Sequence, residues 1–300
     1  MLMTVLRTGP RVVIKDHGRP GHAALGVPPS GAADRGALDR ANELVGNPPS
    51  AAALECTLGG LRVRFDGPAV VALTGVDASL LVDGEAHEAG TAVSVPAGAE
   101  VRVGVPRTAL RGYLAVRGGI DVSPVLGSRS TDAAGIGPAR PAANDVLPIG
   151  VQPDGVVAGG VVADGVAGDD VVTDGETVLE VDLGPRDDWF TAAAIDTFLE
   201  ATYTVTPASD TVGLRLDGSP LSRSRTEELP SEGVVRGSVQ VPPDGRPIIF
   251  QADHPVTGGY PVIAVLTPAS ADRAAQLRPG RRVSFTEASN GVAVPERSRA

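Results

Sequence analysis

Residues Ser231–Pro261 read SEGVVRGSVQVPPDGRPIIFQADHPVTGGYP, a stretch that places polar groups between two apolar runs typical of β-strands. The runs Ser238–Val241 and Pro247–Ala252 are joined by Pro242–Gly245, whose Pro and Asp-Gly content favours a tight reversal. We therefore predict a β-hairpin here. The loop that follows, residues 253–261, is rich in glycine and in hydrogen-bonding side chains, so its backbone can approach a ligand closely.

Short alternating segments separated by Gly and Pro continue on both sides of this hairpin. In Leu61–Phe65 the apolar side chains fall on one face and two arginines on the other, as a half-buried strand requires. Further strands are predicted at Val12–Lys15, Ala69–Leu73, Glu100–Val105, Arg111–Arg117, Thr177–Val181, Val262–Leu266 and Arg282–Phe285. Many short strands at close spacing favour barrels or sandwiches over a parallel βαβ sheet, so the predicted fold class is mainly β.

A few short helices interrupt these strands. Apolar residues recur at helical spacing in Asp34–Val45, where Asp34 can cap the start and a Gly-Asn-Pro sequence ends the helix. Two more helices are predicted at Asp187–Leu199 and at Ala269–Leu277, the latter directly after a proline.

The length of 300 residues is enough for two domains, each with its own core. Residues 151–176 are rich in Gly, Asp and Val and contain no aromatic residue, which is typical of an acidic linker. We therefore expect an N-terminal β domain over 1–150, a C-terminal β domain over 177–288 and a flexible tail over 289–300.

The net charge of −10 and the pI near 4.9 argue against nucleic acid as a partner, because phosphates would be repelled. No apolar run approaches the ~18 residues that a membrane span needs, and the first residues do not resemble a secretory signal. We expect a soluble, cytoplasmic protein. The single cysteine, Cys56, excludes an internal disulfide and a thiolate zinc cluster, and the histidines lack metal-binding spacing, so no metal site is predicted.

Several catalytic motifs are absent from the sequence. It contains no G-x-x-x-x-G-K phosphate loop, no H-E-x-x-H, no G-x-S-x-G and no dinucleotide-binding glycine fingerprint. The only lysine, Lys15, is not flanked by methionine as a biotin-bearing lysine is. We therefore expect no covalently attached biotin on this chain.

Two polar clusters of the N-terminal half are candidate anion sites. Ser30, Asp34 and Arg35 lie where a Gly- and Pro-rich loop enters the first helix, and a helix N-terminus attracts carboxylate or phosphate. Alternatively, Asp34 only caps the helix and Arg35 is solvated. Ser128 and Arg129 belong to a second loop that offers hydroxyl and guanidinium donors, or that is simply a turn with an exposed arginine.

Three residues of the C-terminal half are candidates for acid–base chemistry. Glu232 lies between Ser and Gly and would have a raised pKa if a barrel mouth desolvated it, although it could equally lie on the surface. His254 follows an aspartate and could move protons near neutral pH, or be structural. Asp210 could take part in the chemistry or merely pair with Arg215 across a turn.

The remaining candidates for substrate binding belong to the hairpin and the loop after it. Gln240 and Tyr260 have the hydrogen-bonding groups needed to orient a lactam or amide. Thr257, Gly258 and Gly259 add a hydroxyl and a backbone that a ligand can approach.

Six ordered blocks of the sequence carry a family resemblance that extends over nearly the whole chain. They are DHGRPG at 16–21, GVPPSGAADR at 26–35, ANELVGNP at 41–48, RGGI at 117–120 with LGSRST at 126–131, SDTVGLRL at 209–216, and the 231–261 stretch quoted above. The chain resembles the family of the 5-oxoprolinase C component, also described as the biotin-dependent carboxyltransferase or allophanate hydrolase subunit 2 family, which includes the sporulation regulator KipA. Members often have lysine after GGYP where this chain has Val262, so Arg236 or Arg246 would have to replace it.

The resemblance implies two cyclophilin-like β-barrel domains. It also implies a role as the C component of an ATP-dependent 5-oxoprolinase, with ATP and its Mg²⁺ as co-substrate, that opens 5-oxoproline to glutamate. Its partners would be the B component, which is KipI-like, and the A component, which is LamB/YcsF-like, and the chain alone would be inactive. Two alternatives stay open: a carboxyltransferase acting on urea or a related amide with biotin supplied by another protein, and a KipA-like regulator that sequesters a kinase inhibitor.

Overall fold

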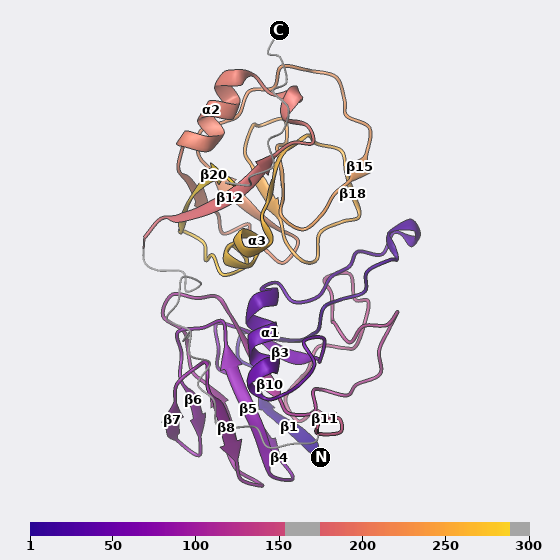
Figure 1. Ribbon diagram of the computed structural model, residues 1–300, viewed down its shortest axis with the longest axis vertical. Coiled ribbons are helices and arrows are strands. Elements are labelled where there is room, and N and C mark those ends of the chain that lie inside the picture. The colour runs from indigo at the N-terminus through magenta and orange to yellow at the C-terminus, as the bar shows by residue number, and fades with distance from the viewer. Residues whose placement is uncertain (154–174, 289–300) are drawn as a thin grey trace.

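The computed structural model describes residues 1–153 and 175–288, which form two β lobes arranged one above the other (Figure 1). Strands between Leu2 and Pro148 make up the N-terminal lobe, and strands between Thr177 and Glu287 make up the C-terminal lobe. Most of the expected linker and the whole expected tail, 289–300, lie outside the described residues. We retain the division into two domains as a proposal.

The N-terminal lobe contains two antiparallel sheets around one core. In hydrogen-bonding order, the first consists of β11 (Val146–Pro148), β1 (Leu2–Arg7), β4 (Arg62–Phe65), β9 (Glu100–Val103), β6 (Leu80–Val82) and β7 (Glu85–His87). The second consists of β2 (Arg11–Lys15), β3 (Ala53–Thr57), β10 (Arg111–Val116), β5 (Ala69–Thr74) and β8 (Ala92–Val95).

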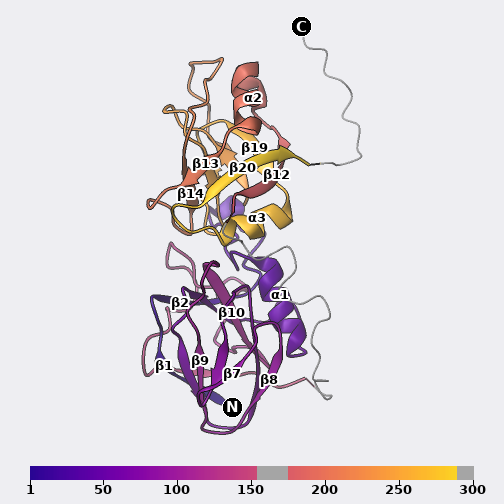
Figure 2. The same ribbon diagram turned by 90° about the vertical axis from the view of Figure 1, so that its left-hand side faces the viewer.

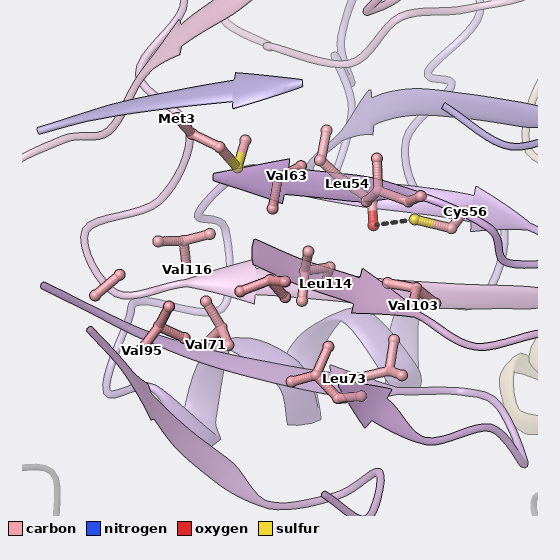
Figure 3. Close-up of a cluster of buried hydrophobic side chains, with 14 of the residues drawn as sticks. Met3, Leu54, Cys56, Val63, Val71, Leu73, Val95, Val103, Leu114 and Val116 are labelled. Carbon is pink, nitrogen blue, oxygen red and sulfur yellow. Dashed lines mark hydrogen bonds between the residues drawn. The ribbon is translucent and has the colours of Figure 1, made fainter. Parts of the chain in front are cut away.

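Alternate side chains from both sheets fill the core of this lobe. Figure 3 shows Met3 and Val63 of the first sheet gathered with Leu54, Leu73 and Leu114 of the second, and all five are fully buried. This burial of apolar surface is what holds the two sheets together. The cysteine, Cys56, belongs to the same cluster, and burial raises the pKa of its thiol, so it behaves as a small apolar side chain.

The C-terminal lobe is a closed barrel. Its strands follow the order β12 (Thr177–Leu183), β19 (Val262–Leu266), β16 (Ser238–Gln240), β17 (Ile248–Phe250), β14 (Gly213–Asp217), β13 (Tyr203–Val205) and β20 (Arg282–Glu287). A parallel pairing of β20 with β12 closes it. The predicted hairpin is confirmed as β16 and β17, and its turn is stabilised by the Gly245 amide, which donates to the Pro242 carbonyl.

Outside the barrel, a short two-stranded ribbon consists of β15 (Glu232–Gly233) and β18 (Thr257–Gly258), and we call it the β15–β18 ribbon. In Figure 1 it lies on the same side of the molecule as the indigo segment around the 3₁₀ turn η1 (Ala23–Leu25), which extends from the N-terminal lobe. Both segments contribute to the cleft described below.

Two of the three predicted helices are confirmed nearly to the residue, as α1 (Arg35–Leu44) and α3 (Pro268–Ala275). The prediction at Asp187–Leu199 is wrong at its start. There the structure has a 3₁₀ turn, η2 (Asp187–Trp189), and then α2 (Ala192–Glu200), because Thr191 is extended and its hydroxyl caps a new helix by accepting from the Ala194 amide.

The helices place the two lobes against each other. α1 packs on β10 and β5 of the N-terminal lobe and meets α3 of the C-terminal lobe, as Figures 1 and 2 both show. Three small buried side chains, Ala33, Ala252 and Ala275, form an apolar contact at this junction and let the backbones approach closely.

The predicted fold class, mainly β with a few short helices, is confirmed: the described residues contain three α-helices among twenty strands. The C-terminal half closes as a barrel, and the N-terminal half consists of two sheets that enclose a common core. In the described part of the chain, no helix has the length and apolar character to cross a bilayer.

Truncation of one aromatic side chain in the barrel should test how its core is built. Phe285 on β20 is buried and stacks on Phe198 of α2 at a centroid distance of 4.3 Å. We expect Phe285→Ala to lower the free energy of unfolding by about 3–5 kcal/mol, because it removes the ring and leaves a cavity. Urea denaturation would measure this change.

Val178 on β12 supplies the control, since 51% of it is exposed. Val178→Ala should stay within about 0.5 kcal/mol of the wild type. Equal effects of the two substitutions would contradict the packing described here.

Candidate functional site

A buried ion pair joins the two lobes. Lys15 Nζ on β2 lies 3.1 Å from Asp253 Oδ1 in the C-terminal lobe, and both side chains are at most 2% exposed. Ser30 donates its hydroxyl to the same carboxylate oxygen at 2.6 Å and accepts from Lys15 at 3.3 Å. Since removing one partner of a buried ion pair leaves an uncompensated charge, these contacts make the relative position of the lobes specific.

The start of α1 is a second link between the lobes. Asp34 caps the helix by accepting from the Ala37 amide at 2.9 Å. The amides of Arg35 and Gly36 donate to the Asp272 carboxylate of α3 at 2.9 and 3.1 Å. The cap predicted for Asp34 is confirmed, whereas the expected substrate cradle at this helix N-terminus is not found, because two carboxylates of the protein already accept from these amides.

Gln276, just after α3, completes the junction. Its Oε1 accepts from the amides of Leu110 and Arg111 at 3.1 and 2.8 Å, and its Nε2 donates to the Arg111 carbonyl at 2.9 Å. The same nitrogen donates to Asp34 Oδ2 at 2.7 Å. A single buried amide thus connects a β-strand edge and a helix cap of one lobe to the other lobe.

Beside this junction lies a cavity of about 690 Å³, which we call the interlobe cleft. The N-terminal lobe contributes the loop from Arg19 to Val27 together with Arg35, and the C-terminal lobe contributes 233–236, His254 and the start of α3. Its lining is mostly apolar with a few charged groups, a combination usual for small-molecule sites.

His254 is the titratable group in the interlobe cleft best suited to take a proton. Its Nδ1 lies 2.7 Å from the Pro255 carbonyl, and since a carbonyl only accepts, Nδ1 carries the hydrogen. Nε2 then has a free lone pair, and it is buried without a hydrogen-bond partner in the described structure. Burial, together with the charges of Arg35 and Arg236, lowers the pKa of His254 from 6.5, so the imidazole is neutral at pH 7.

Three arginines line the interlobe cleft, and two of them already have carboxylate partners: Arg19 pairs with Asp132 at 3.0 Å and Arg236 with Asp272 at 2.5 Å. Arg19, Arg35 and Arg236 all line it, and the Nε of each is buried without a hydrogen-bond partner among the described residues. Burial, and next the neighbouring charge of Arg236, lowers the pKa of Arg35. Arg35 is the one of these three whose guanidinium has no ion pair among the described residues, so a carboxylate or phosphate in the cleft could pair with it.

Four other predicted site residues line a different cavity. Asp210, Arg215, Gln240 and Tyr260 surround a space of about 750 Å³ beside β14, β16 and β17, which we call the barrel-wall cavity. The structure therefore divides the predicted residues between two cavities. Asp210 does not pair with Arg215; its carboxylate accepts from the amides of Val212 and Gly213 at 2.8 and 3.0 Å.

The β15–β18 ribbon lines the interlobe cleft and lies behind a side chain of the barrel-wall cavity. Its Gly233 lines the interlobe cleft, whereas Gly258 lies against the side chain of Gln240, which lines the barrel-wall cavity. Thr257 and Gly259 accompany Gly258 but line neither of the two cavities. The aromatic ring of Phe250, in the barrel-wall cavity, lies 6.0 Å from the imidazole of His254, so the two cavities are close neighbours.

Glu232, also on the β15–β18 ribbon, does not have the raised pKa expected of a catalytic acid. Arg186 Nε donates to both of its carboxylate oxygens, at 3.1 and 3.0 Å. This hydrogen-bonded pairing lowers the pKa of Glu232. The expectation of desolvation is wrong because the side chain is about one-third exposed.

Ser128 and Arg129 surround a carboxylate of the protein itself. The hydroxyls of Ser128 and Ser130 each donate to Asp16 Oδ1 at 2.6 Å, and the Arg129 amide donates to Asp16 Oδ2 at 2.6 Å. The Arg129 guanidinium donates to Asp121 and to the Val122 carbonyl. The anion that this loop was expected to bind is thus Asp16, so the contact fixes the loop that carries Arg19.

Sequence reasoning named Ser30 and Asp34, which lie at the junction of the lobes, but missed other residues of the junction and of the interlobe cleft. Arg19 and Asp253 were detectable, since Arg19 lies in a Gly- and Pro-rich loop and Asp253 precedes His254 in the 231–261 stretch. Asp272 and Gln276 carry no such signal. Among the described residues, no three His, Cys, Asp or Glu side chains come together as a metal-binding group.

Comparison with known proteins gives consistent matches. Residues 25–287 match the family described as carboxyltransferase domain, subdomain A and B. The C subunit of 5-oxoprolinase from Escherichia coli K12 is 36% identical over 292 residues, which cover 96% of this chain and 92% of that protein.

Two crystal structures share the fold. TTHA0988 superposes with a TM-score of 0.85 at 32% identity, and the urea carboxylase of Kluyveromyces lactis with a TM-score of 0.89 at 28% identity. The matches cover 95% and 96% of this chain. The chain spans only 56% of TTHA0988 and 27% of the urea carboxylase.

The buried Asp34 predicts a pH dependence of stability. Burial, with Asp272 as the next contribution, raises the pKa of Asp34 from 3.8 to about 6. At a pH between these two pKa values the folded state binds more protons than the unfolded state. The contribution of Asp34 to the free energy of unfolding therefore falls as the pH rises from about 4 to 6. Relative to Asp34→Asn, the wild type should lose about 2–3 kcal/mol of unfolding free energy between pH 4 and pH 7.

Urea denaturation of both proteins at the two pH values measures this difference, and groups common to both proteins cancel. If the difference in unfolding free energy between the wild type and Asp34→Asn is the same at both pH values, the raised pKa is contradicted. The same holds if the wild type gains stability relative to the variant as pH rises.

Proposed function

Because the chain belongs to the carboxyltransferase domain family, subdomain A and B, we propose that it is the C component of an ATP-dependent 5-oxoprolinase. In this reaction one water opens the lactam ring of 5-oxoproline to give glutamate. The likeness to the Escherichia coli protein, over nearly the full length of both chains, supports this choice of substrate.

The observation that carries the proposal is the unpartnered Nε2 of His254 in a cleft lined by arginines. Hydrolysis of a lactam needs a base to take a proton from the attacking water, and a neutral imidazole with a free lone pair can do this at pH 7. It also needs the substrate carboxylate to be held in place, for which Arg35 and Arg236 have free donors. His254 and these two arginines line one cavity of about 690 Å³.

The amide resonance of a lactam makes its carbonyl a poor electrophile, which gives ATP a role. ATP, when bound, would supply a phosphoryl group to the lactam oxygen and leave as ADP, and a second water would release that group as phosphate after the ring has opened. The Arg35 guanidinium fits this need, since its Nε has no partner among the described residues and an arginine binds phosphate oxygens well. Arg19 and Arg236 line the same cleft and already pair with Asp132 and Asp272. The same positive charges would stabilise negative charge that develops at the attacked carbon's oxygens.

We assign the functions that this chain does not supply to two partner proteins, the A and B components of the enzyme. We therefore expect this chain to be inactive alone. The Escherichia coli relative is itself named as one subunit of 5-oxoprolinase. An ATP-consuming role is consistent with a cytoplasmic location.

A carboxyltransferase acting on urea or a related amide is the second candidate. The TM-score of 0.89 with Kluyveromyces lactis urea carboxylase favours it. In that case the interlobe cleft would hold the amide, and biotin would be carried by another protein. Release of glutamate from 5-oxoproline would support the oxoprolinase, and transfer of a carboxyl group to urea would support the carboxyltransferase.

The test combines the purified chain with the A and B components of its own organism and measures ATP-dependent glutamate release. We expect His254→Gln to lower kcat about 10²–10⁴-fold, the contribution typical of a general base. The wild-type kcat/KM should decline with falling pH below 6.5, as the lowered pKa of His254 requires, and the variant should lack this decline.

His87 on β7 is the matched control because it lies outside both cavities. His87→Gln should leave turnover unchanged. Absence of glutamate release from the complete mixture would remove the oxoprolinase proposal, and full activity of His254→Gln would remove the assignment of the base.

A further inference from the structure

A second histidine, His22, lines the interlobe cleft together with His254. The lining residues with titratable side chains are these two histidines and the arginines Arg19, Arg35 and Arg236. Arginine keeps its proton in proteins, so among the lining residues only the histidines can exchange one near neutral pH. His254 is the proposed base, which leaves His22 as the lining residue that can give a proton.

The two histidines come from opposite lobes. His22 directly precedes the 3₁₀ turn η1 in the loop that extends from the N-terminal lobe, and His254 follows β17 in the C-terminal lobe. In Figure 1 that loop lies on the same side of the molecule as the β15–β18 ribbon, which also lines the cleft. A substrate held between the lobes would therefore meet one imidazole from each of them.

The loop fixes the backbone of His22 and leaves its side chain free. The His22 carbonyl accepts from the amides of Leu25 and Val27, at 2.9 and 3.3 Å, which closes the tip of the loop on itself. The imidazole is half-buried and makes no hydrogen bond or ion pair with any described residue. Both of its ring nitrogens are therefore available to a ligand in the cleft.

The charges of the cleft are compatible with a protonated His22. Two of the arginines, Arg19 and Arg236, are each paired with a carboxylate of the protein, so their charges are compensated locally. Arg35 has no ion pair among the described residues, and the substrate carboxylate would compensate it. Once substrate is bound, an imidazolium at His22 thus meets little uncompensated positive charge.

The opening of a lactam ring needs a proton donor as well as a base. After water has attacked the carbonyl carbon, the ring nitrogen can leave only when it has gained a proton, because its anion is far too basic to be expelled. A base such as His254 takes a proton from the attacking water and cannot supply this one in the same position. The cleft therefore needs a second proton-transferring group.

We infer that His22 is the general acid of the hydrolysis proposed above, acting from the opposite lobe to His254. The His22 imidazolium gives its proton to the ring nitrogen, and the electron pair of the C–N bond leaves with that nitrogen. The carbonyl re-forms from the oxygen of the attacking water, whose remaining proton passes to solvent. His22 then takes a new proton from solvent. This inference rests on the proposed hydrolysis in the interlobe cleft.

Two substrates that differ in their leaving atom test the assignment in the complete mixture with the A and B components. 5-Oxoproline expels an amine nitrogen, whereas its thiolactone analogue, 5-oxotetrahydrothiophene-2-carboxylate, expels a thiolate that needs no proton. We expect His22→Gln to lower kcat about 10²–10⁴-fold for 5-oxoproline, measured as glutamate release. The kcat for the thiolactone, measured as thiol release, should stay nearly unchanged. Equal losses for both substrates, or no loss for 5-oxoproline, would overturn the inference.

Leu25→Ala is the matched control, since Leu25 lies on the same loop, is 73% exposed and does not line the cleft. It should leave both kcat values unchanged, and thermal melting would establish that each variant is folded. A loss of 5-oxoproline turnover in Leu25→Ala as large as that in His22→Gln would assign the effect to the loop and contradict a role of the imidazole.

NMR spectra of the complex with ¹³C-labelled histidine give a readout that needs no turnover. 5-Oxoproline should shift the ring signals of His22 and His254 and leave that of His87 in place, each signal being assigned with its Gln variant. An unshifted His22 would overturn the inference whether or not glutamate is released. Shifts of both cleft histidines without glutamate release would instead overturn the proposed hydrolysis, and with it the role of His22 as its acid.

Discussion

The ion pair between Lys15 and Asp253 is the contact on which the arrangement of the two lobes depends. It joins β2 to the loop after β17 across 238 residues of sequence, and both charges are buried. Burying charge is costly unless a partner is in place, so a displaced lobe would leave an ammonium and a carboxylate without compensation. Gln276 and Asp272 add hydrogen bonds that fit only the same relative position of α1 and α3.

This fixed junction explains why functional groups from distant parts of the chain can share a cavity. Arg19 and Arg35 come from the N-terminal lobe, and Arg236 and His254 come from the C-terminal lobe. Asp253 is bound at the junction and His254 follows it directly, so the same loop connects the lobes and places the imidazole. The barrel-wall cavity, in contrast, is built within one lobe, where the register of β14, β17 and β16 places Arg215, Ile248 and Gln240 in its lining.

The sequence predicted what local pattern determines and missed what tertiary contact determines. Alternation in Leu61–Phe65 and the turn at Pro242–Gly245 predicted strands and a hairpin correctly, because both signals are local. Helix α2 begins five residues later than predicted, because Thr191 is extended and caps a new helix, which interrupts the helical pattern that starts at Asp187. Glu232 was expected to be desolvated, but the Arg186 that pairs with it is 46 residues away. No local signal could show that Asp272 would cap a helix of the other lobe.

Differential scanning calorimetry of the full chain tests the central claim that the buried contacts make the two lobes one cooperative unit. The account predicts a single transition for the wild type, with calorimetric and van't Hoff enthalpies equal. Asp253→Asn, which leaves Lys15 without its counter-ion, should separate this into two transitions or lower the midpoint of one lobe selectively. Two resolved transitions in the wild type itself would contradict the account.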